Sequence, residues 1–145
     1  MTRDVLVTIS GKRLMGSGDE DIEFVMPGTH LERNGIHMVR YEEPAEGMDG
    51  KTENTIVIGG GCMKIRKKGL SNVEMRFLNR AERSMSCYST PYGDFLIGIS
   101  TRDISIREES DRLRVSVDYA MDIGAEHLSD CSIQLEVRSR SAAAQ

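Results

Sequence analysis

Apolar and polar residues alternate along almost the whole of this 145-residue chain. The pattern is clearest late in the sequence, where Leu113, Val115, Val117 and Tyr119 alternate with charged or polar residues. Successive side chains of a β-strand point to opposite faces of the sheet, so a period of two indicates one buried and one exposed face. Parallel strands are covered on both faces and read as continuous apolar runs, whereas this alternation is typical of antiparallel sheets. The sequence therefore predicts an all-β, antiparallel fold.

Turn signals separate the alternating segments at short intervals. The alternation recurs at residues 5–9, 22–26, 63–66, 73–77 and 133–138. Between the second and third of these segments, the dipeptide Asn34-Gly35 predicts a two-residue type I′ hairpin, because both turn positions need a positive φ. This turn places Glu32 opposite His37 and His30 opposite Val39 in the expected register.

The spacing of the turns indicates the architecture. About ten strands, spaced roughly every 8–12 residues, favour a sandwich or a barrel. Hairpins between consecutive strands favour an up-and-down meander, and closing the meander removes the exposed edges that invite aggregation. We therefore predict an antiparallel meander that closes into a small lipocalin-like β-barrel, with little or no helix.

Length and charge are those of a single domain. A chain of this size can build a hydrophobic core without a metal or disulfide staple. We predict one barrel domain over residues 1–138 and a flexible C-terminal tail over residues 139–145, where small polar and alanine residues take over. The net charge is −4, from 19 Lys and Arg against 23 Asp and Glu, so we expect no nucleic-acid partner.

The sequence also predicts a location. No stretch approaches 18 consecutive apolar residues, and the opening Met-Thr-Arg-Asp leads into a strand pattern rather than an apolar signal core. The three cysteines, Cys62, Cys87 and Cys131, are odd in number and widely spaced, so they predict neither a disulfide framework nor a metal knuckle. We expect no membrane association and a reducing, cytoplasmic location.

Several residues occur in the order of a known family. They are Tyr41, Glu42 and Glu43; Thr52 and Thr55; Arg66 and Gly69; the run Tyr88-Ser89-Thr90-Pro91-Tyr92-Gly93; and Tyr119. Together they resemble the YwiB-like family of bacterial proteins from about Thr2 to Arg138, and Thr90-Pro91-Tyr92-Gly93 is the most specific part. The resemblance implies a calycin-like β-barrel in a bacterial cytoplasm. The family is functionally uncharacterised, so no catalytic residue is carried over.

A barrel of about eight strands is either filled by side chains or holds one small ligand. Nine methionines could pack irregular interior space. We predict a non-enzymatic binding module for a small apolar or amphipathic ligand in the barrel. The alternative is a protein-interaction or assembly module whose barrel is filled and holds no ligand, for instance one that forms a homodimer.

The candidate ligand-binding residues would meet at a barrel mouth. Hydroxyl groups and a guanidinium suit an anionic or amphipathic ligand. The candidates are Tyr41, Glu43, Arg66, Tyr88, Tyr92 and Tyr119. Two simpler interpretations compete, because Tyr often serves as a half-buried wall residue and the basic run around Arg66 is typical of a solvated strand face.

The hairpin register also predicts a cluster of metal-ligating residue types. His30 and His37 would be diagonal neighbours about 7–8 Å apart, with Glu32 directly opposite His37. This set could hold a borderline metal such as zinc. A cross-strand ion pair between Glu32 and His37 explains the same residues and is the preferred interpretation.

Motifs of known enzymes are missing from the sequence. There is no Gly-x-Ser-x-Gly elbow, and the run Gly59-Gly60-Gly61 lacks the Lys-Ser/Thr of a phosphate-binding loop. We therefore assign no catalytic residue and expect no cofactor.

Overall fold

The computed structural model describes residues 3–15, 18–44, 51–69, 72–78, 83–123 and 126–140. The ten elements formed by these residues are all β-strands. They are β1 (Asp4–Met15), β2 (Gly18–Arg33), β3 (Ile36–Pro44), β4 (Lys51–Gly59), β5 (Cys62–Lys68), β6 (Val73–Phe77), β7 (Arg83–Thr90), β8 (Gly93–Glu108), β9 (Arg112–Ile123) and β10 (Glu126–Ser139). The predicted all-β fold is confirmed.

The strands form one antiparallel sheet in the order β6-β5-β4-β3-β2-β1-β10-β9-β8-β7. Every neighbouring pair except β1 and β10 is consecutive in sequence, which confirms the predicted meander. The first and last strands pair with each other from Val5↔Ser139 to Leu14↔Asp130. The two edges of the sheet are therefore β6 and β7, which lie in the middle of the chain.

The barrel is nearly closed between these two edges. Within the described ranges, one bridge joins them: Asn72 and Ser89 exchange two backbone hydrogen bonds, each 2.8 Å long. Strand β6 has only five residues, and a short edge strand offers little template for pairing with another chain. The edges consequently depend on packing beneath them more than on a hydrogen-bond ladder.

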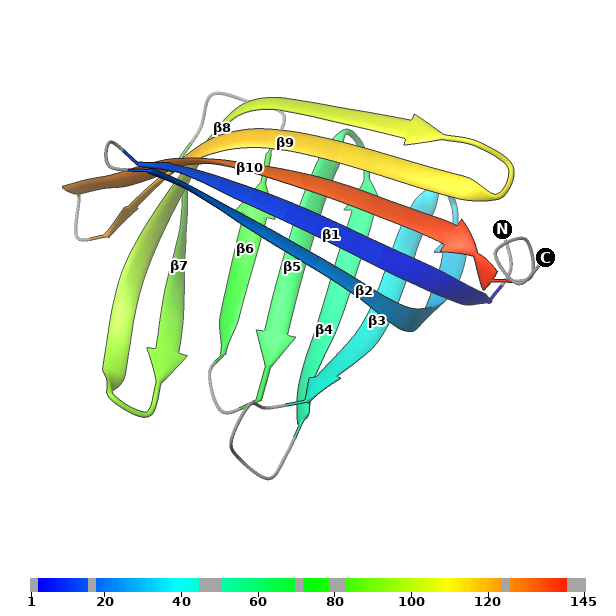
Figure 1. Cartoon of the computed structure of the whole chain (residues 1–145), viewed down its shortest axis with the longest axis horizontal. Coiled ribbons are helices and arrows are strands. Elements are labelled where there is room, and N and C mark those ends of the chain that lie inside the picture. The colour runs from blue at the N-terminus through cyan, green and yellow to red at the C-terminus, as the bar shows by residue number, and fades with distance from the viewer. Residues whose placement is uncertain are drawn as a thin grey trace.

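One face of the sheet supplies that packing. Figure 1 shows β1, β2 and β10 crossing in front of β3–β6 at a steep angle, and the buried side chains form one cluster with members from both groups of strands. The largest fully buried side chains are Phe77, Ile56, Ile58, Met63, Ile99 and Leu113. The ring of Phe77 on edge strand β6 meets Tyr119 of β9 edge-to-face, with 4.9 Å between centroids. Strands far apart in the sheet thus touch through the interior.

The predicted hairpin turn is also confirmed. Asn34 and Gly35 both have positive φ, at 54° and 78°. The flanking register is the expected one, with Arg33 opposite Ile36 and Glu32 opposite His37. A turn with this twist matches the right-handed twist of its strands, so the local sequence determines which hairpin residues face the core.

The end of the barrel domain lies slightly later than predicted. The sequence predicts that Ser139 begins the tail, whereas in the structure it belongs to β10 and is 2% exposed. Its amide donates a hydrogen bond of 3.0 Å to the carbonyl of Asp111, which ties it to the β8–β9 turn. Residues 141–145 lie outside the described part of the chain. No helix among the described residues is long and apolar enough to cross a membrane.

Replacing Phe77 tests whether cross-barrel packing holds the edge strand. Phe77→Ala should lower the free energy of unfolding by about 3–5 kcal/mol, because a fully buried ring and its contact with Tyr119 are lost. Phe95→Ala is the matched control, since that ring is 45% exposed, and it should cost about 1 kcal/mol or less. Urea unfolding followed by circular dichroism measures both. Equal losses in the two variants would contradict the core assignment of Phe77.

Candidate functional site

Strands β2 and β3 pair only near their shared turn. Their ladder ends at Thr29↔Arg40, beyond which β2 pairs with β1 alone and β3 with β4 alone. Gly28 lies at the point of divergence. A Cβ atom at this position would lie 2.6 Å from the carbonyl oxygen of Arg40, closer than real Cβ contacts come. Glycine therefore lets the two backbones approach closely just before they separate.

A cleft of about 720 Å³ opens where the strands separate. This volume falls within the range of roughly 300–1,000 Å³ that is usual for small-molecule sites. Strands β2, β3, β4 and β5 all contribute to its lining. Its charged lining residues are Arg40, Arg66 and Lys68 together with Glu42 and Glu53.

The charged lining belongs to the outer face of the barrel. Arg40 lies opposite Thr55, and Thr55 lies opposite Arg66, so these three residues form one cross-strand row. Their neighbours along the chain, such as Val39 and Ile56, are fully buried. Since adjacent residues of a strand point to opposite faces, the row points away from the core.

Two cations of the cleft are not engaged by carboxylates. Arg66 pairs with Glu74 at 3.3 Å, and Glu42 pairs with Lys51 at 3.3 Å. In the portion of the chain that the structure describes, Arg40 and Lys68 take part in no ion pair. Their charges are available to a ligand.

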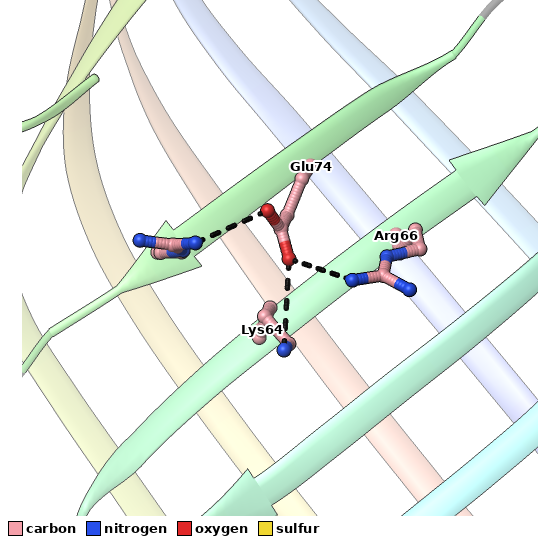
Figure 2. Close-up of polar contacts among 4 residues, drawn as sticks. Lys64, Arg66 and Glu74 are labelled. Atoms are coloured by element: carbon pink, nitrogen blue, oxygen red, sulfur yellow. Dashed lines mark hydrogen bonds and ion pairs between the residues drawn. The ribbon is translucent and has the colours of Figure 1, made fainter. Parts of the chain in front are cut away.

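Glu74 of β6 gathers three cations beside the cleft. Figure 2 shows Lys64 and Arg66 of the adjacent strand reaching one oxygen of its carboxylate, at 3.5 Å and 3.3 Å. Arg76 contacts the other oxygen at 3.2 Å. Partial burial by itself would raise the pKa of the Glu74 carboxyl. The hydrogen bond from Arg66 and the charges of Arg76 and Lys64 outweigh it and hold that pKa below its ordinary value.

A second polar group lies on the inner face of β3, β4 and β5. Glu43 Oε1 accepts a hydrogen bond from Asn54 Nδ2 at 3.0 Å and lies 3.6 Å from Lys67 Nζ. Asn54 is 1% exposed, and its Oδ1 has no hydrogen-bond partner. Burial, reinforced by the charge of Glu43, raises the pKa of the Tyr41 hydroxyl. Because Tyr41 and Asn54 also line the cleft, a neutral hydroxyl and a buried acceptor adjoin its charged row.

The six predicted ligand residues do not meet at one mouth. Tyr41 and Arg66 both line the cleft, and Glu43 contacts its neighbour Asn54. Tyr119 is buried against Phe77, and Tyr88 is half-buried against the core. Tyr92 is 94% exposed in the turn between β7 and β8.

The sequence-based reasoning missed Arg40, Lys68 and Asn54. In the sequence, Arg40 and Lys68 look like ordinary polar residues on the outer face of a strand. Two local signals could have pointed to them. Pro27 and Gly28 lie inside a strand, where proline and glycine mark a place at which pairing on one side ends. Asn54 is a polar residue in the phase of its strand that Ile56 and Ile58 continue with apolar side chains.

The predicted histidine cluster has a different arrangement from the one expected. His30, Glu32 and His37 share the inner face, and Glu32 Oε2 lies 3.3 Å from His37 Nε2 as expected. His30, however, contacts the other nitrogen of the His37 ring, Nδ1, at 2.9 Å. Glu108 of β8, which the sequence did not indicate, lies 2.7 Å from His37 Nε2.

The fold and the cleft define a small antiparallel β-barrel with a polar cleft on its outer face. Residues 7–135 match the family described as "Domain of unknown function (DUF1934)", and the chain belongs to this family. It is 24% identical over 141 residues to "Uncharacterized beta-barrel protein YwiB" of Bacillus subtilis (strain 168), covering 94% of this chain and 96% of that protein. The predicted YwiB-like membership is confirmed.

A solved structure shows the same fold. The crystal structure of the ywiB protein from Bacillus subtilis superposes with a TM-score of 0.82 at 17% sequence identity. The match covers 94% of this chain and 92% of that one. At this identity the likeness extends to the barrel architecture alone, so the function of the cleft must be argued from its own residues.

Acid titration tests the charge cluster around Glu74. Because its carboxyl has a lowered pKa in the folded state, its stabilising effect is present at neutral pH and is lost as the pH falls through that value. Glu74→Gln should therefore cost about 1 kcal/mol or less at pH 7, and its difference from wild type should shrink below about pH 4. Urea unfolding at several pH values measures this. Glu109→Gln, in the exposed β8–β9 turn, is the control, and a Glu74→Gln deficit that grew with acid would refute the assignment.

Proposed function

We propose that the protein is a non-enzymatic binding module that takes a small amphipathic anion in the cleft between β2 and β3. The observation that carries the proposal is the combination of ligand-sized volume with uncompensated cations: the cleft measures about 720 Å³, and Arg40 and Lys68 form no ion pair with any described residue. A guanidinium offers paired donors that match carboxylate and phosphate groups.

The distribution of charge within the cleft suggests how such a ligand lies. Arg40 and Arg66 belong to one cross-strand row, whereas Glu42 and Glu53 oppose each other in the ladder two residues further along β3. An anionic head group is favoured over the arginine row and repelled by the two carboxylates. Pro27 and the ring of Tyr41 offer contact to an apolar portion of the ligand.

The packing of the core supports a site outside the interior. The sequence-based prediction placed the ligand inside the barrel, but Ile56, Ile58 and Phe77 are completely buried and belong to one continuous cluster. Close-packed interiors leave few voids larger than a water molecule. An amphipathic ligand fits the open cleft better than this core.

A second candidate function, protein–protein interaction, has support from the β7–β8 hairpin. Its exposed large apolar side chains are Met85, Tyr92, Phe95 and Leu96, with exposures from 41% to 94%. Exposed apolar groups that gather on one element often mark an interaction surface, such as a homodimer contact. Native mass spectrometry of tag-free protein separates the two functions. A monomer carrying a small molecule favours the cleft, and a ligand-free dimer favours the hairpin.

Three properties stay predictions from the sequence: the calycin-like relationship, the cytoplasmic location and the absence of nucleic-acid and membrane partners. The row of cations at the cleft is local. The whole chain carries a net charge of −4, which disfavours general binding to a polyanion.

Hexyl phosphate is the probe that tests the proposed ligand class. In isothermal titration it should bind more tightly than inorganic phosphate or 1-hexanol. Only the complete probe can contact the cations of the cleft through its phosphate and the apolar wall through its hexyl chain. Arg40→Gln and Arg66→Gln should each weaken binding about tenfold through loss of a charge-assisted hydrogen bond. Arg138→Gln, an exposed arginine on β10, is the control and should bind like wild type. Unchanged affinity in Arg40→Gln, or no binding of hexyl phosphate, would refute the proposal.

A further inference from the structure

His37 lies between two carboxylates that come from different strands. Its Nε2 is 2.7 Å from Glu108 Oε1 and 3.3 Å from Glu32 Oε2. One ligand-type atom from each of the three residues can be chosen so that all lie within 4.8 Å of one another. Glu108 on β8 is 71 residues from His37 on β3, and these strands are not neighbours in the sheet. The cluster therefore spans the barrel, on the opposite face of the β2–β3 hairpin from the cleft.

A small rotation of the carboxylates would bring these atoms to the separations of ligands that share one metal ion. Metal–ligand bonds to His nitrogen and carboxylate oxygen are about 2.0–2.2 Å long, which places neighbouring ligand atoms of a tetrahedral site about 3.3–3.6 Å apart. The 3.3 Å contact of His37 Nε2 with Glu32 has this spacing, and the 2.7 Å contact with Glu108 would lengthen when the ion replaces the hydrogen. The carboxylate side chains are 51% and 56% exposed, so they can rotate to adjust, whereas the His37 side chain is 7% exposed and stays in place.

His30 holds the His37 ring from behind. Its Nε2 lies 2.9 Å from His37 Nδ1, the two rings stack with centroids 5.1 Å apart, and His30 is 6% exposed. When a metal occupies Nε2 of a neutral imidazole, the proton resides on Nδ1, from where it can be donated to His30 Nε2. Acceptors placed behind a ligand histidine in this way determine its tautomer and orientation.

We propose that Glu32, His37 and Glu108 form a binding site for a divalent transition-metal ion, best matched by Zn²⁺, with His30 as the positioning residue. Imidazole and carboxylate ligands suit Zn²⁺, and two carboxylates balance its charge. The ion would replace the hydrogen between His37 Nε2 and the carboxylates. Three protein ligands leave a coordination position open to water. The site is separate from the proposed anion cleft and does not depend on it.

Titration of the tag-free, EDTA-treated full chain with ZnCl₂ tests the site. Isothermal titration should show one Zn²⁺ per chain, with affinity reduced at least about tenfold in Glu32→Gln and in Glu108→Gln. Both substitutions keep the shape of half-exposed side chains, so circular dichroism should show a folded protein. Glu109→Gln changes the net charge equally beside Glu108 and should leave affinity unchanged. If wild type binds no Zn²⁺, or if both ligand variants bind as wild type does, the site does not exist.

The role of His30 has its own test. His30→Leu removes the acceptor behind His37 and should weaken Zn²⁺ binding about 10–100-fold. His30→Gln supplies an oxygen acceptor and should restore part of the affinity. If His30→Leu and His30→Gln, each shown to be folded, bind Zn²⁺ with equal affinity, His30 has no positioning role. The three ligand residues are tested separately by the first titration.

Discussion

Burial of one face of every strand in a shared interior is the constraint on which the rest of this structure depends. A ten-stranded sheet with one apolar face can hide that face only by rolling onto itself. The edges that then meet, β6 and β7, share a single described bridge, so contacts through the interior hold the barrel together. Phe77 against Tyr119 is one such contact, and His37 with Glu108 is another at the rim.

The same constraint places the polar chemistry at the rim and on the outer face. As the sheet coils, strand β2 stays paired with β1 and strand β3 stays paired with β4. Strands β2 and β3 therefore separate beyond Gly28, and the cleft lies between them. The outer-face row through Arg40 and Arg66 supplies its cations. The inner-face residues at the hairpin end, where the core gives way to solvent, supply the histidine cluster. Neither group needs a hollow barrel.

Much of the fold could be predicted from local sequence because period-two alternation reports directly on the two faces of a strand. The alternation predicts a buried face for Leu113, Val115 and Val117, and Asn34-Gly35 predicts the register that places Glu32 opposite His37. Contacts between strands distant in sequence could not be predicted. Glu108 reaches His37 across 71 residues, and Arg40 lines a cleft only because β2 turns away. Both depend on how the sheet coils, which the alternation of apolar and polar residues does not report.

The most direct test of an outer-face binding site above a filled interior is nuclear magnetic resonance with hexyl phosphate added stepwise. Amide signals of Gly28, Thr29 and Thr55, at the cleft, should shift with saturation. Methyl signals of the fully buried Ile56 and Val117 should stay in place. Shifts of the Ile56 and Val117 methyl groups with unchanged cleft amides would contradict this arrangement and would locate the ligand inside the barrel.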